Sequence, residues 1–393
     1  MLINSRSPIE SIPSPLGRHD DSATPRSIFG SRLKLWNDWS DRSTLYQDSA
    51  FSTPVAALND PIGGVLDKSR GLALGSELVT NGDFSSGTGW TPGTGWTISG
   101  GVASFSNPTG SSLAQTGLPA MPAGCWYQVE FDLVQTSGSG CTMGLNVGGG
   151  IDSFGSFSGT GHKKAVVLTT VSRSGISITG IGNSVISIDN VTLKELSGNH
   201  AFQATSASRP LWKQDVNGCF NALFDGTDDS WATAAIDFSA SDKIAVFAAV
   251  RKLSDPGRAM LVECGTGSEN GTFGIEAPFA ASATYGFYSR GTAQIRLSSA
   301  ASYAAPITNV LTLLGNISAP SVTLRVNGVQ DTTSGSSQGT GNYGNLPVNI
   351  GRRAGASLPV NLALYQLFIV QGAVTAAEIA AAEAYLNSKS KAY

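Results

Sequence analysis

Short apolar runs separated by Gly- and Ser-rich turns follow one another along most of this chain, and this pattern constrains the fold more than any other feature. The chain contains 47 Gly in 393 residues, and only 13% of its residues are charged. Short runs bounded by turn residues are typical of β-strands in sandwiches and barrels. The sequence therefore predicts an all-β fold with tight polar connections, rather than a helical or alternating α/β fold.

The runs themselves can be placed by residue number. The expected strands are 127–134, 142–147, 164–171, 175–179, 185–196, 243–251, 272–275, 285–288, 310–314, 322–326, 348–350 and 362–370. The last run is apolar on both faces, which predicts a central, buried strand. Asn327-Gly328 predicts a tight hairpin turn. A change of apolar parity after Ile188 predicts a β-bulge at Asp189-Asn190.

One helix is expected, close to the end of the chain. The segment TAAEIAAAEAYLNSK begins with Thr375 and has Glu378 three residues later, the spacing of a capping box. Ile379, Ala382 and Leu386 then lie on one face at helical spacing.

Size and charge exclude several classes of protein. A chain of 393 residues suits two sandwiches with a small additional segment. The net charge is −3 and no run of Lys and Arg occurs, so we expect no nucleic-acid partner. The sequence contains no run of 18 apolar residues, so we expect no membrane span. The first residues also lack the apolar core of a secretion signal. We therefore expect a protein that starts in the cytoplasm and is released by other means, such as cell lysis.

The four cysteines do not form a metal-binding pattern. Cys125, Cys141, Cys219 and Cys264 make no CxxC pair and have no clustered histidines. We expect buried apolar thiols, with a Cys125–Cys141 disulfide left open.

Residues 1–30 lack any apolar period and contain four prolines. We expect an extended N-terminal arm that anchors the chain on another subunit or on the surface of a larger assembly, with simple terminal disorder as the alternative.

Two stretches resemble known carbohydrate-binding folds. Residues 226–393 carry DGTDDSW, TLRVNGV, VNIGRR and a final strand followed by a short helix, and they resemble concanavalin A-like, laminin-G-like lectin domains. Residues 78–196 carry LVTNGDFSSGTGW, WTISGGVASF, YQVEFDL and ISIDNVTLKEL, and they resemble carbohydrate-binding jelly rolls of the family 4/9 type.

A third resemblance links the two. The segment from Trp36 to Ser69 resembles a motif of phage structural proteins that usually continues directly into GNHAxQAT-x-x-xRP, which here begins only at Gly198. This implies that the jelly roll interrupts the lectin domain. The expected units are 1–30 as the anchoring arm, 31–75 and 198–393 as the two parts of the lectin-like sandwich, and 76–197 as the inserted jelly roll. Insertion at a surface loop costs little when the inserted domain has adjacent termini.

Nothing in the sequence marks a catalytic constellation. The three histidines are scattered, and no nucleophile elbow, phosphate-binding loop or HExxH helix occurs. Asp228 and Asp229 are expected to cap a turn, and a second metal site with Asp225 is the less favoured interpretation. We therefore expect no enzymatic activity, while a cryptic polysaccharide hydrolase with two facing carboxylates stays an open alternative.

Aromatic residues are the expected sugar contacts, because rings stack on the apolar faces of sugars. Trp90 lies in a Gly/Thr loop and is expected to be exposed. Trp126 and Tyr127 are neighbours on a strand, so one should be buried and the other available for binding.

Calcium is the cofactor that the jelly-roll resemblance implies. In that family a structural calcium often lies where the first and last strands meet. Asp189 matches the acidic position, with Glu77 and Asp83 as further ligands, and carboxylate and carbonyl oxygens are what calcium prefers. The alternative is that Asp189 only stabilises its own turn.

Together these features predict a bacteriophage virion structural protein, a tail fibre, head fibre or capsid decoration protein, that attaches to the host through surface polysaccharide. The expected location is the virion, and the expected protein partners are other virion proteins, reached through the arm. A homotrimer stays open, since no coiled-coil heptads are present to argue it. A purely architectural virion subunit without sugar binding is the main alternative.

Overall fold

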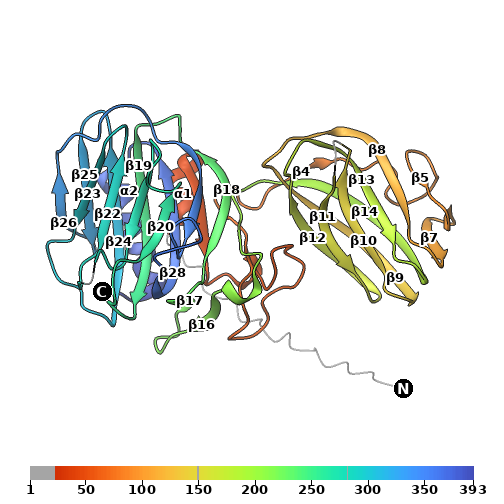
Figure 1. The fold of residues 1–393 in the computed structure, drawn as a ribbon, viewed down its shortest axis with the longest axis horizontal. Helices are drawn as coiled ribbons and strands as arrows, with labels where there is room; N and C mark the ends of the chain where they lie inside the picture. Colours follow the sequence, from red (N-terminus) through yellow and green to blue (C-terminus); the bar gives the residue numbers. More distant parts are fainter. Residues whose placement is uncertain (1–22, 148–149, 281) are drawn as a thin grey trace, which may run out of the picture.

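Two β-sandwiches lie next to one another along the long axis of the molecule (Figure 1). The computed structural model describes residues 23–147, 150–280 and 282–393. We call the sandwich formed by β1–β3 and β15–β28 the large sandwich, and the one formed by β4–β14 the small sandwich. Nearly all regular structure is antiparallel β, so the expected all-β fold class is confirmed.

The large sandwich consists of an eight-stranded and a nine-stranded sheet. The eight-stranded sheet contains β1 (Leu33–Asp38), β16 (Leu211–Gln214), β17 (Phe220–Asp225), β19 (Lys243–Lys252), β24 (Ile307–Asn316), β25 (Ser321–Val326), β26 (Val329–Ser334) and β28 (Asn361–Gln371). The nine-stranded sheet contains β2 (Leu45–Tyr46), β3 (Gly64–Val65), β15 (Ala201–Phe202), β18 (Trp231–Asp237), β20 (Met260–Cys264), β21 (Phe273–Glu276), β22 (Gly286–Arg290), β23 (Gln294–Ser298) and β27 (Asn345–Ile350).

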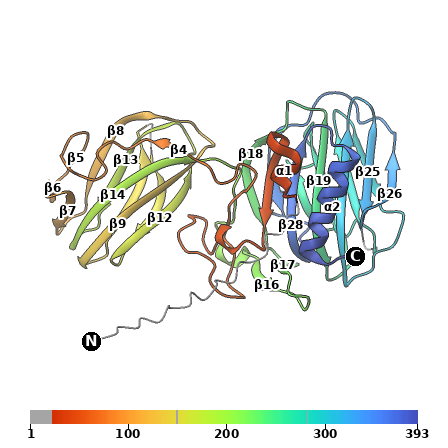
Figure 2. The same ribbon diagram turned by 180° about the vertical axis from the view of Figure 1, so that it is seen from behind.

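Strand β28 is an interior strand of the eight-stranded sheet. It lies between β17 and β19 and also pairs with β1, as its two-sided apolar run predicts. One face of β28 enters the core between the two sheets, where Leu367 and Ile369 are fully buried. The other face packs with Tyr365 and Phe368 beneath helix α2 (Ala376–Ser390). Figure 2 shows α1 (Pro25–Phe29) and α2 in front of this sheet.

The predicted capping box begins helix α2. Thr375 accepts a bond from the Glu378 backbone N–H, and the Glu378 side chain accepts one from the Thr375 N–H. This reciprocal pair satisfies two donors that an uncapped helix leaves open.

The prediction of an extended arm through residue 30 was wrong at its C-terminal end. Residues 25–29 form helix α1, with Thr24 as N-cap and Pro25 in the first turn. Phe29 anchors the helix because its ring is buried against Phe247 and Phe368. Residues 1–22 of the predicted arm lie outside the described residues.

The small sandwich contains the strands between Leu74 and Leu196 in two sheets, so it begins two residues before the expected boundary at residue 76. One sheet contains β5 (Thr91–Pro92), β8 (Ser111–Met121), β10 (Cys141–Asn146), β11 (Asp152–Phe157) and β13 (Arg173–Gly180). The other contains β4 (Leu74–Glu77), β6 (Trp96–Ser99), β7 (Val102–Asn107), β9 (Trp126–Ser137), β12 (Gly161–Leu168) and β14 (Ser184–Leu196). The register of β14 against β9 shifts between Asp189 and Thr192, which confirms the predicted bulge.

The chain passes from one sandwich to the other and back at a single junction. On the large sandwich, Val65 pairs with Ala201 and Gly64 with Phe202, so segments on either side of the small sandwich lie in one sheet. The buried carboxylate of Asp67 accepts backbone N–H groups of Trp36 and Asn199 at 2.8 and 2.7 Å. The junction is therefore tied together by strand pairing and by one buried acid.

Several smaller predictions can be compared with the structure. Asn327 and Gly328 turn β25 into β26 with positive φ at both residues, as a tight hairpin requires. All four cysteines are free thiols, so the Cys125–Cys141 disulfide is not formed. Three short 3₁₀ helices, at Gly30–Arg32, Arg42–Thr44 and Ser206–Ser208, complete the described elements. No helix among the described residues is long and apolar enough to cross a bilayer.

Candidate functional site

A row of side chains crosses the nine-stranded sheet on the face that points away from the core. Pairing of β27, β20, β21, β22 and β23 places one residue of each strand in this row: Asn349, Glu263, Gly274, Tyr288 and Arg296. The alternate residues of the same strands fill the core between the sheets. Because side chains alternate along a strand, the row lies on the outer face. We call this surface, with the loops that cover it, the arginine face.

Glu263 is the first of two buried carboxylates that hold the side chains of the arginine face in place. Its side chain is fully buried and accepts a bond from the Tyr288 hydroxyl at 2.8 Å. The Arg353 guanidinium lies against the same carboxylate, with Nε and Nη2 at 2.9 and 2.8 Å from Oε1. Burial, followed by the charge of Glu263, raises the pKa of Tyr288 well above its ordinary value, so this hydroxyl stays protonated and donates.

Glu276 is the second of these buried carboxylates, and it lies two residues after Gly274 on the same face of β21. It is also fully buried, and two arginines converge on it. Arg258 approaches Oε1 with Nε at 2.6 Å and Nη2 at 2.5 Å. Arg296 binds in bidentate fashion, with Nε at 2.9 Å from Oε2 and Nη2 at 2.6 Å from Oε1. Such forked pairs fix the plane of a guanidinium as well as its position.

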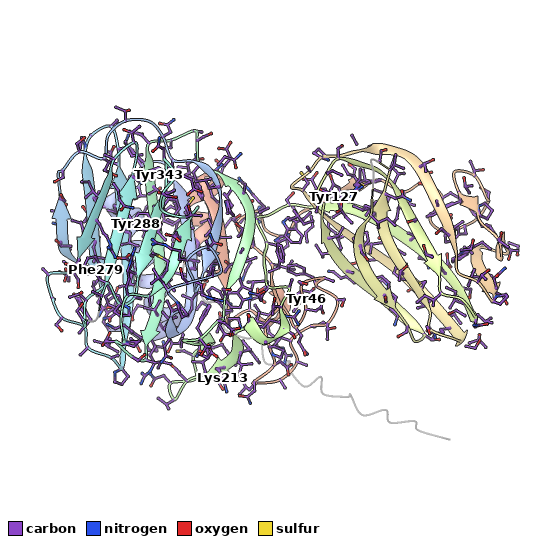
Figure 3. The ribbon with its side chains drawn as sticks, in the orientation of Figure 1. Tyr46, Tyr127, Lys213, Phe279, Tyr288 and Tyr343 are labelled. Atoms are coloured by element: carbon purple, nitrogen blue, oxygen red, sulfur yellow. The ribbon has the colours of Figure 1, made fainter. Side chains whose placement is uncertain are left out.

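Two glycines leave room for these side chains to lie flat on the sheet. A Cβ on Gly274 would stand 2.4 Å from Cε1 of Tyr288, and a Cβ on Gly286 would stand 2.5 Å from the Glu276 carboxylate and from the Phe279 ring. The Arg296 guanidinium lies 4.5 Å from the centre of the Phe279 ring, which is cation–π distance. Figure 3 shows Tyr288 and Phe279 on this side of the large sandwich.

The charged groups differ sharply in exposure. The two glutamates have no accessible side-chain surface, whereas Arg258, Arg296 and Arg353 are 29%, 31% and 26% exposed. The carboxylates therefore act as buried supports and the guanidiniums form the accessible layer. Guanidinium groups held in this way can bind carboxylates or sugar hydroxyls.

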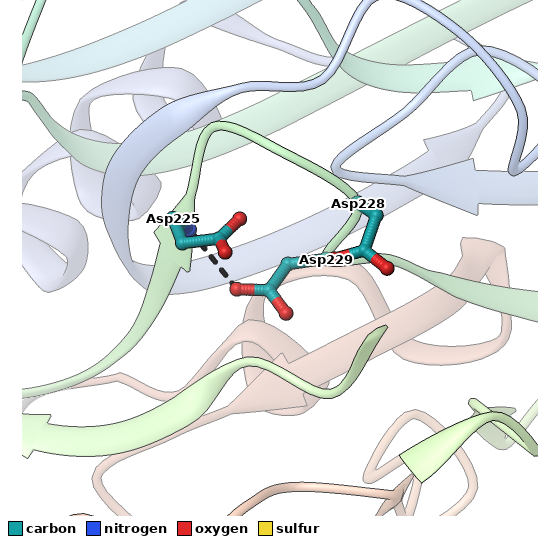
Figure 4. Close-up of side chains that lie close together, drawn as sticks. All are labelled: Asp225, Asp228 and Asp229. Carbon is teal, nitrogen blue, oxygen red and sulfur yellow. Dashed lines mark hydrogen bonds between the residues drawn. The ribbon is translucent and has the colours of Figure 1, made fainter. Parts of the chain in front are cut away.

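A cluster of carboxylates lies at the turn between β17 and β18. Oxygens of Asp225, Asp228 and Asp229 lie within 4.8 Å of one another, and this is the one such group of potential ligands among the residues described (Figure 4). Asp229 Oδ2 accepts the backbone N–H of Asp225, so the predicted turn-stabilising role of this residue is found. Burial, with the nearby charges of Asp225 and Asp228, raises the pKa of Asp229 to about 6. The Ser208 hydroxyl donates to Asp228 at 2.7 Å.

The expected exposure of Trp90 was wrong. The side chain is 5% exposed, packs against Phe84 and donates its Nε1–H to the Asn81 carbonyl at 3.1 Å. The Gly/Thr loop folds back through a turn between Gly87 and Trp90, which puts the indole into the core of the small sandwich.

The expectation that Trp126 or Tyr127 would be available was also wrong, since both are buried. Tyr127 points into the small sandwich core, as strand alternation requires. Trp126 points out of it, but that surface is covered by the large sandwich, where Phe51 and His200 contact the indole. The sequence could not show this contact because the residues involved are far apart in the chain.

The calcium residues lie where the opening and closing segments of the small sandwich meet, but their carboxylates do not form one group. Glu77 Oε1 accepts the backbone N–H groups of Leu78, Val79 and Leu193. Asp83 and Asp189 accept bonds from the residues that follow them, Ser85 and Asn190. Their role in binding calcium stays a prediction.

The arginine face was missed by the sequence reasoning, although a signal exists. In β21 and β22 one parity is mostly apolar, with Phe273, Ile275 and Phe287. The other parity carries glycine, glutamate, tyrosine and arginine: Gly274, Glu276, Gly286, Tyr288 and Arg290. Glycine and glutamate on the outward parity of a strand indicate a sheet face that is covered by flat or charged groups.

Comparisons with known proteins add little to this geometry. No protein-family model matches the chain, and no curated protein sequence matches it. The binding domain of Paraclostridial Mosquitocidal Protein 1 is 15% identical over 48% of this chain and 49% of its own, with a TM-score of 0.36. Trypanosoma rangeli sialidase in complex with the inhibitor DANA is 12% identical over 47% of this chain and 29% of its own, also with a TM-score of 0.36.

A smaller structure is covered more fully. The Ruminococcus gnavus IT-sialidase CBM40 bound to α2,3 sialyllactose is 15% identical over 35% of this chain and 79% of its own, with a TM-score of 0.29. This chain spans about half, or less, of the first two proteins.

Proposed function

We propose that this chain is a non-enzymatic, carbohydrate-binding subunit of a bacteriophage virion, such as a tail fibre, head fibre or decoration protein. In this role the large sandwich binds host-surface glycans and the rest of the chain holds it on the particle. The expected location is the virion, with other virion proteins as partners and the segment before helix α1 as the point of attachment.

The observation that carries the binding role is the arginine face. Glu263 and Glu276 are inaccessible to solvent, yet they hold three partly exposed guanidiniums in fixed positions. Burying two carboxylates costs solvation free energy, which only closely placed partners offset. Because a simple structural surface does not need this arrangement, we take it as a sign of ligand binding. Donors that are fixed before binding lose little entropy when a ligand arrives.

The virion role is supported by the arrangement of the chain. The phage-type motif is split between residues 36–69 and the segment that starts at Gly198, and Val65 and Ala201 pair in one sheet. The small sandwich is thus carried as a side branch, and we propose that calcium stabilises it through Asp189, Glu77 and Asp83.

A glycan array probed with the purified chain tests the binding role. We expect retention on a subset of bacterial surface polysaccharides, and loss of that retention in the variant Arg296→Gln. Failure to retain any glycan would refute the binding role and favour the architectural alternative, in which both sandwiches only make protein contacts. Detection of the chain in purified particles by antibody labelling tests the virion role separately.

The hydrolase alternative has a direct test. Glu263 and Glu276 are two buried carboxylates on one sheet face, but guanidiniums occupy both of them. We expect no new reducing ends when retained polysaccharides are incubated with the protein. Release of oligosaccharides that stops in both Glu263→Gln and Glu276→Gln would instead establish hydrolysis.

A further inference from the structure

We infer that the arginine face binds its glycan through carboxylate groups on the sugars, so that the ligand is an acidic polysaccharide. This inference rests on the proposed glycan binding and names the chemical class of its ligand.

The charge balance of the face is the first argument. Four guanidiniums, those of Arg258, Arg290, Arg296 and Arg353, lie on or beside it, against the carboxylates of Glu263, Glu276 and Glu269. Cations are therefore in excess here, although the whole chain has a net charge of −3. A local cationic excess on an acidic protein favours anionic ligands at this face over the rest of the surface.

The unused donors are the second argument. Arg258, Arg296 and Arg353 each contact a glutamate through Nε and Nη2, and their Nη1 groups make no hydrogen bond with any described residue. A guanidinium has five N–H donors, so each of these arginines keeps an outer edge free. That edge matches the two oxygens of a carboxylate, and the guanidinium stays charged at any physiological pH.

The third argument is that the cations cannot swing away to make other contacts. Arg296 is held by both oxygens of Glu276 and lies on the Phe279 ring. Gly267 brings its backbone against Arg353, because a Cβ there would stand 2.9 Å from Glu263 and 3.2 Å from Arg353 Nη2. Long side chains usually lose rotamer entropy when they bind, and here that loss has already occurred on folding.

The guanidiniums are held at two separate places on the face. Arg353 lies on Glu263, whereas Arg258 and Arg296 lie on Glu276. Glu263 pairs with Gly274, so Glu276 is one strand across and two residues along from it, roughly 8 Å away at about 4.8 Å between strands and 3.4 Å per residue. Two separate cationic places favour a ligand with more than one carboxylate, as an acidic polysaccharide has.

The test compares acidic glycans with their neutral counterparts. An array carries uronic-acid and other carboxylated oligosaccharides, the same oligosaccharides after reduction of the carboxyls to alcohols, and sulfated neutral oligosaccharides. We expect retention on carboxylated spots, with affinity at least about tenfold weaker after reduction, because each charge-assisted bond is worth roughly a factor of ten. The same retention should weaken as salt is raised.

Two variants and a matched control place the binding on this face. Arg296→Gln and Arg353→Gln each remove one guanidinium, while Glu276 keeps Arg258 and Glu263 keeps Tyr288. Arg325→Gln is the control, because Arg325 forms the same kind of forked pair with Glu383 of helix α2, on the other side of the large sandwich. We expect a loss of at least about tenfold in affinity for each of the first two and none for the control.

The outcomes separate this inference from the proposed function. Equal affinity for carboxylated and reduced glycans would overturn the inference and leave glycan binding intact. Preference for sulfated spots would also overturn it, because the bound group would not be a carboxylate. Retention on no glycan at all would overturn both. Carboxyl reduction is measured on the unaltered protein, so the test stands even if a variant fails to fold.

Discussion

Replacement of Asp67 is expected to be the most damaging single change at the junction of the two sandwiches. The carboxylate is fully buried and accepts four hydrogen bonds, from the backbone N–H groups of Trp36, Ser69 and Asn199 and from the Ser69 hydroxyl, at 2.7 to 2.8 Å. Burial raises the pKa of Asp67 by more than these hydrogen bonds lower it. Keeping the carboxylate charged therefore costs solvation free energy.

The size of the stability loss follows from the hydrogen-bond donors that lose their acceptor. Asp67→Ala strands three buried backbone N–H groups, each costing about 1–3 kcal/mol, while part of this is regained because the carboxylate no longer has to be desolvated. We expect a net loss of about 3–5 kcal/mol in the free energy of unfolding. Asp67→Asn keeps one acceptor for Trp36 and Ser69 and loses the bond from Asn199, so it should cost about 2 kcal/mol.

Asp48 provides a matched control. It also accepts four bonds, from Ala50, from Ser52 twice and from Thr53, but in a partly exposed loop where water can replace it. Asp48→Ala should therefore cost about 1 kcal/mol. Equilibrium denaturation followed by tryptophan fluorescence gives all three values. A loss below about 1 kcal/mol for Asp67→Ala, or one equal to that of Asp48→Ala, would refute the reasoning.

Three further predictions follow from other sites. Trp126→Ala removes the indole that fills the contact between the sandwiches, so we expect a larger radius of gyration in solution scattering and faster proteolysis near residues 71–75; unchanged scattering would contradict this. The pKa of Asp229 in the folded protein is raised to about 6. The wild type should therefore lose stability relative to Asp229→Asn as the pH rises from about 4 to 6, which urea unfolding midpoints at both pH values would measure. A stability difference that does not change with pH would contradict this. If calcium binds the small sandwich, chelation should lower the melting temperature of the wild type and leave that of Asp189→Asn unchanged, whereas equal shifts would show that Asp189 is not a ligand.

Local patterns in the sequence located the strands with strong apolar runs, although strands such as β8 (Ser111–Met121) and β18 (Trp231–Asp237) were not predicted. The two-sided apolar run 362–370 became the central strand β28, and the Thr375–Glu378 spacing became a real capping box. The parity change at Asp189 became a bulge. These features depend on residues close together in the chain, where strand alternation and helix capping act directly.

The burial of the predicted sugar-contacting residues depended on contacts that no local pattern contains. Trp90 was expected to be exposed, and one of Trp126 and Tyr127 to be available. Instead, a folded-back loop puts Trp90 into the core of the small sandwich, and the large sandwich covers Trp126. Thr24 and Pro25 begin a helix inside the predicted arm because Phe29 finds a buried site against distant strands.

The sequence by itself determined the strongly apolar strands such as β28, the Asn327-Gly328 hairpin turn and the capped helix, because each follows from side-chain periodicity and backbone preference over a few residues. Only the tertiary structure decided that Glu263, Glu276 and three arginines from separate strands and loops share one face. The physical reason is register: strands distant in sequence bring these residues together, and burial of the carboxylates is a property of the assembled sheet alone.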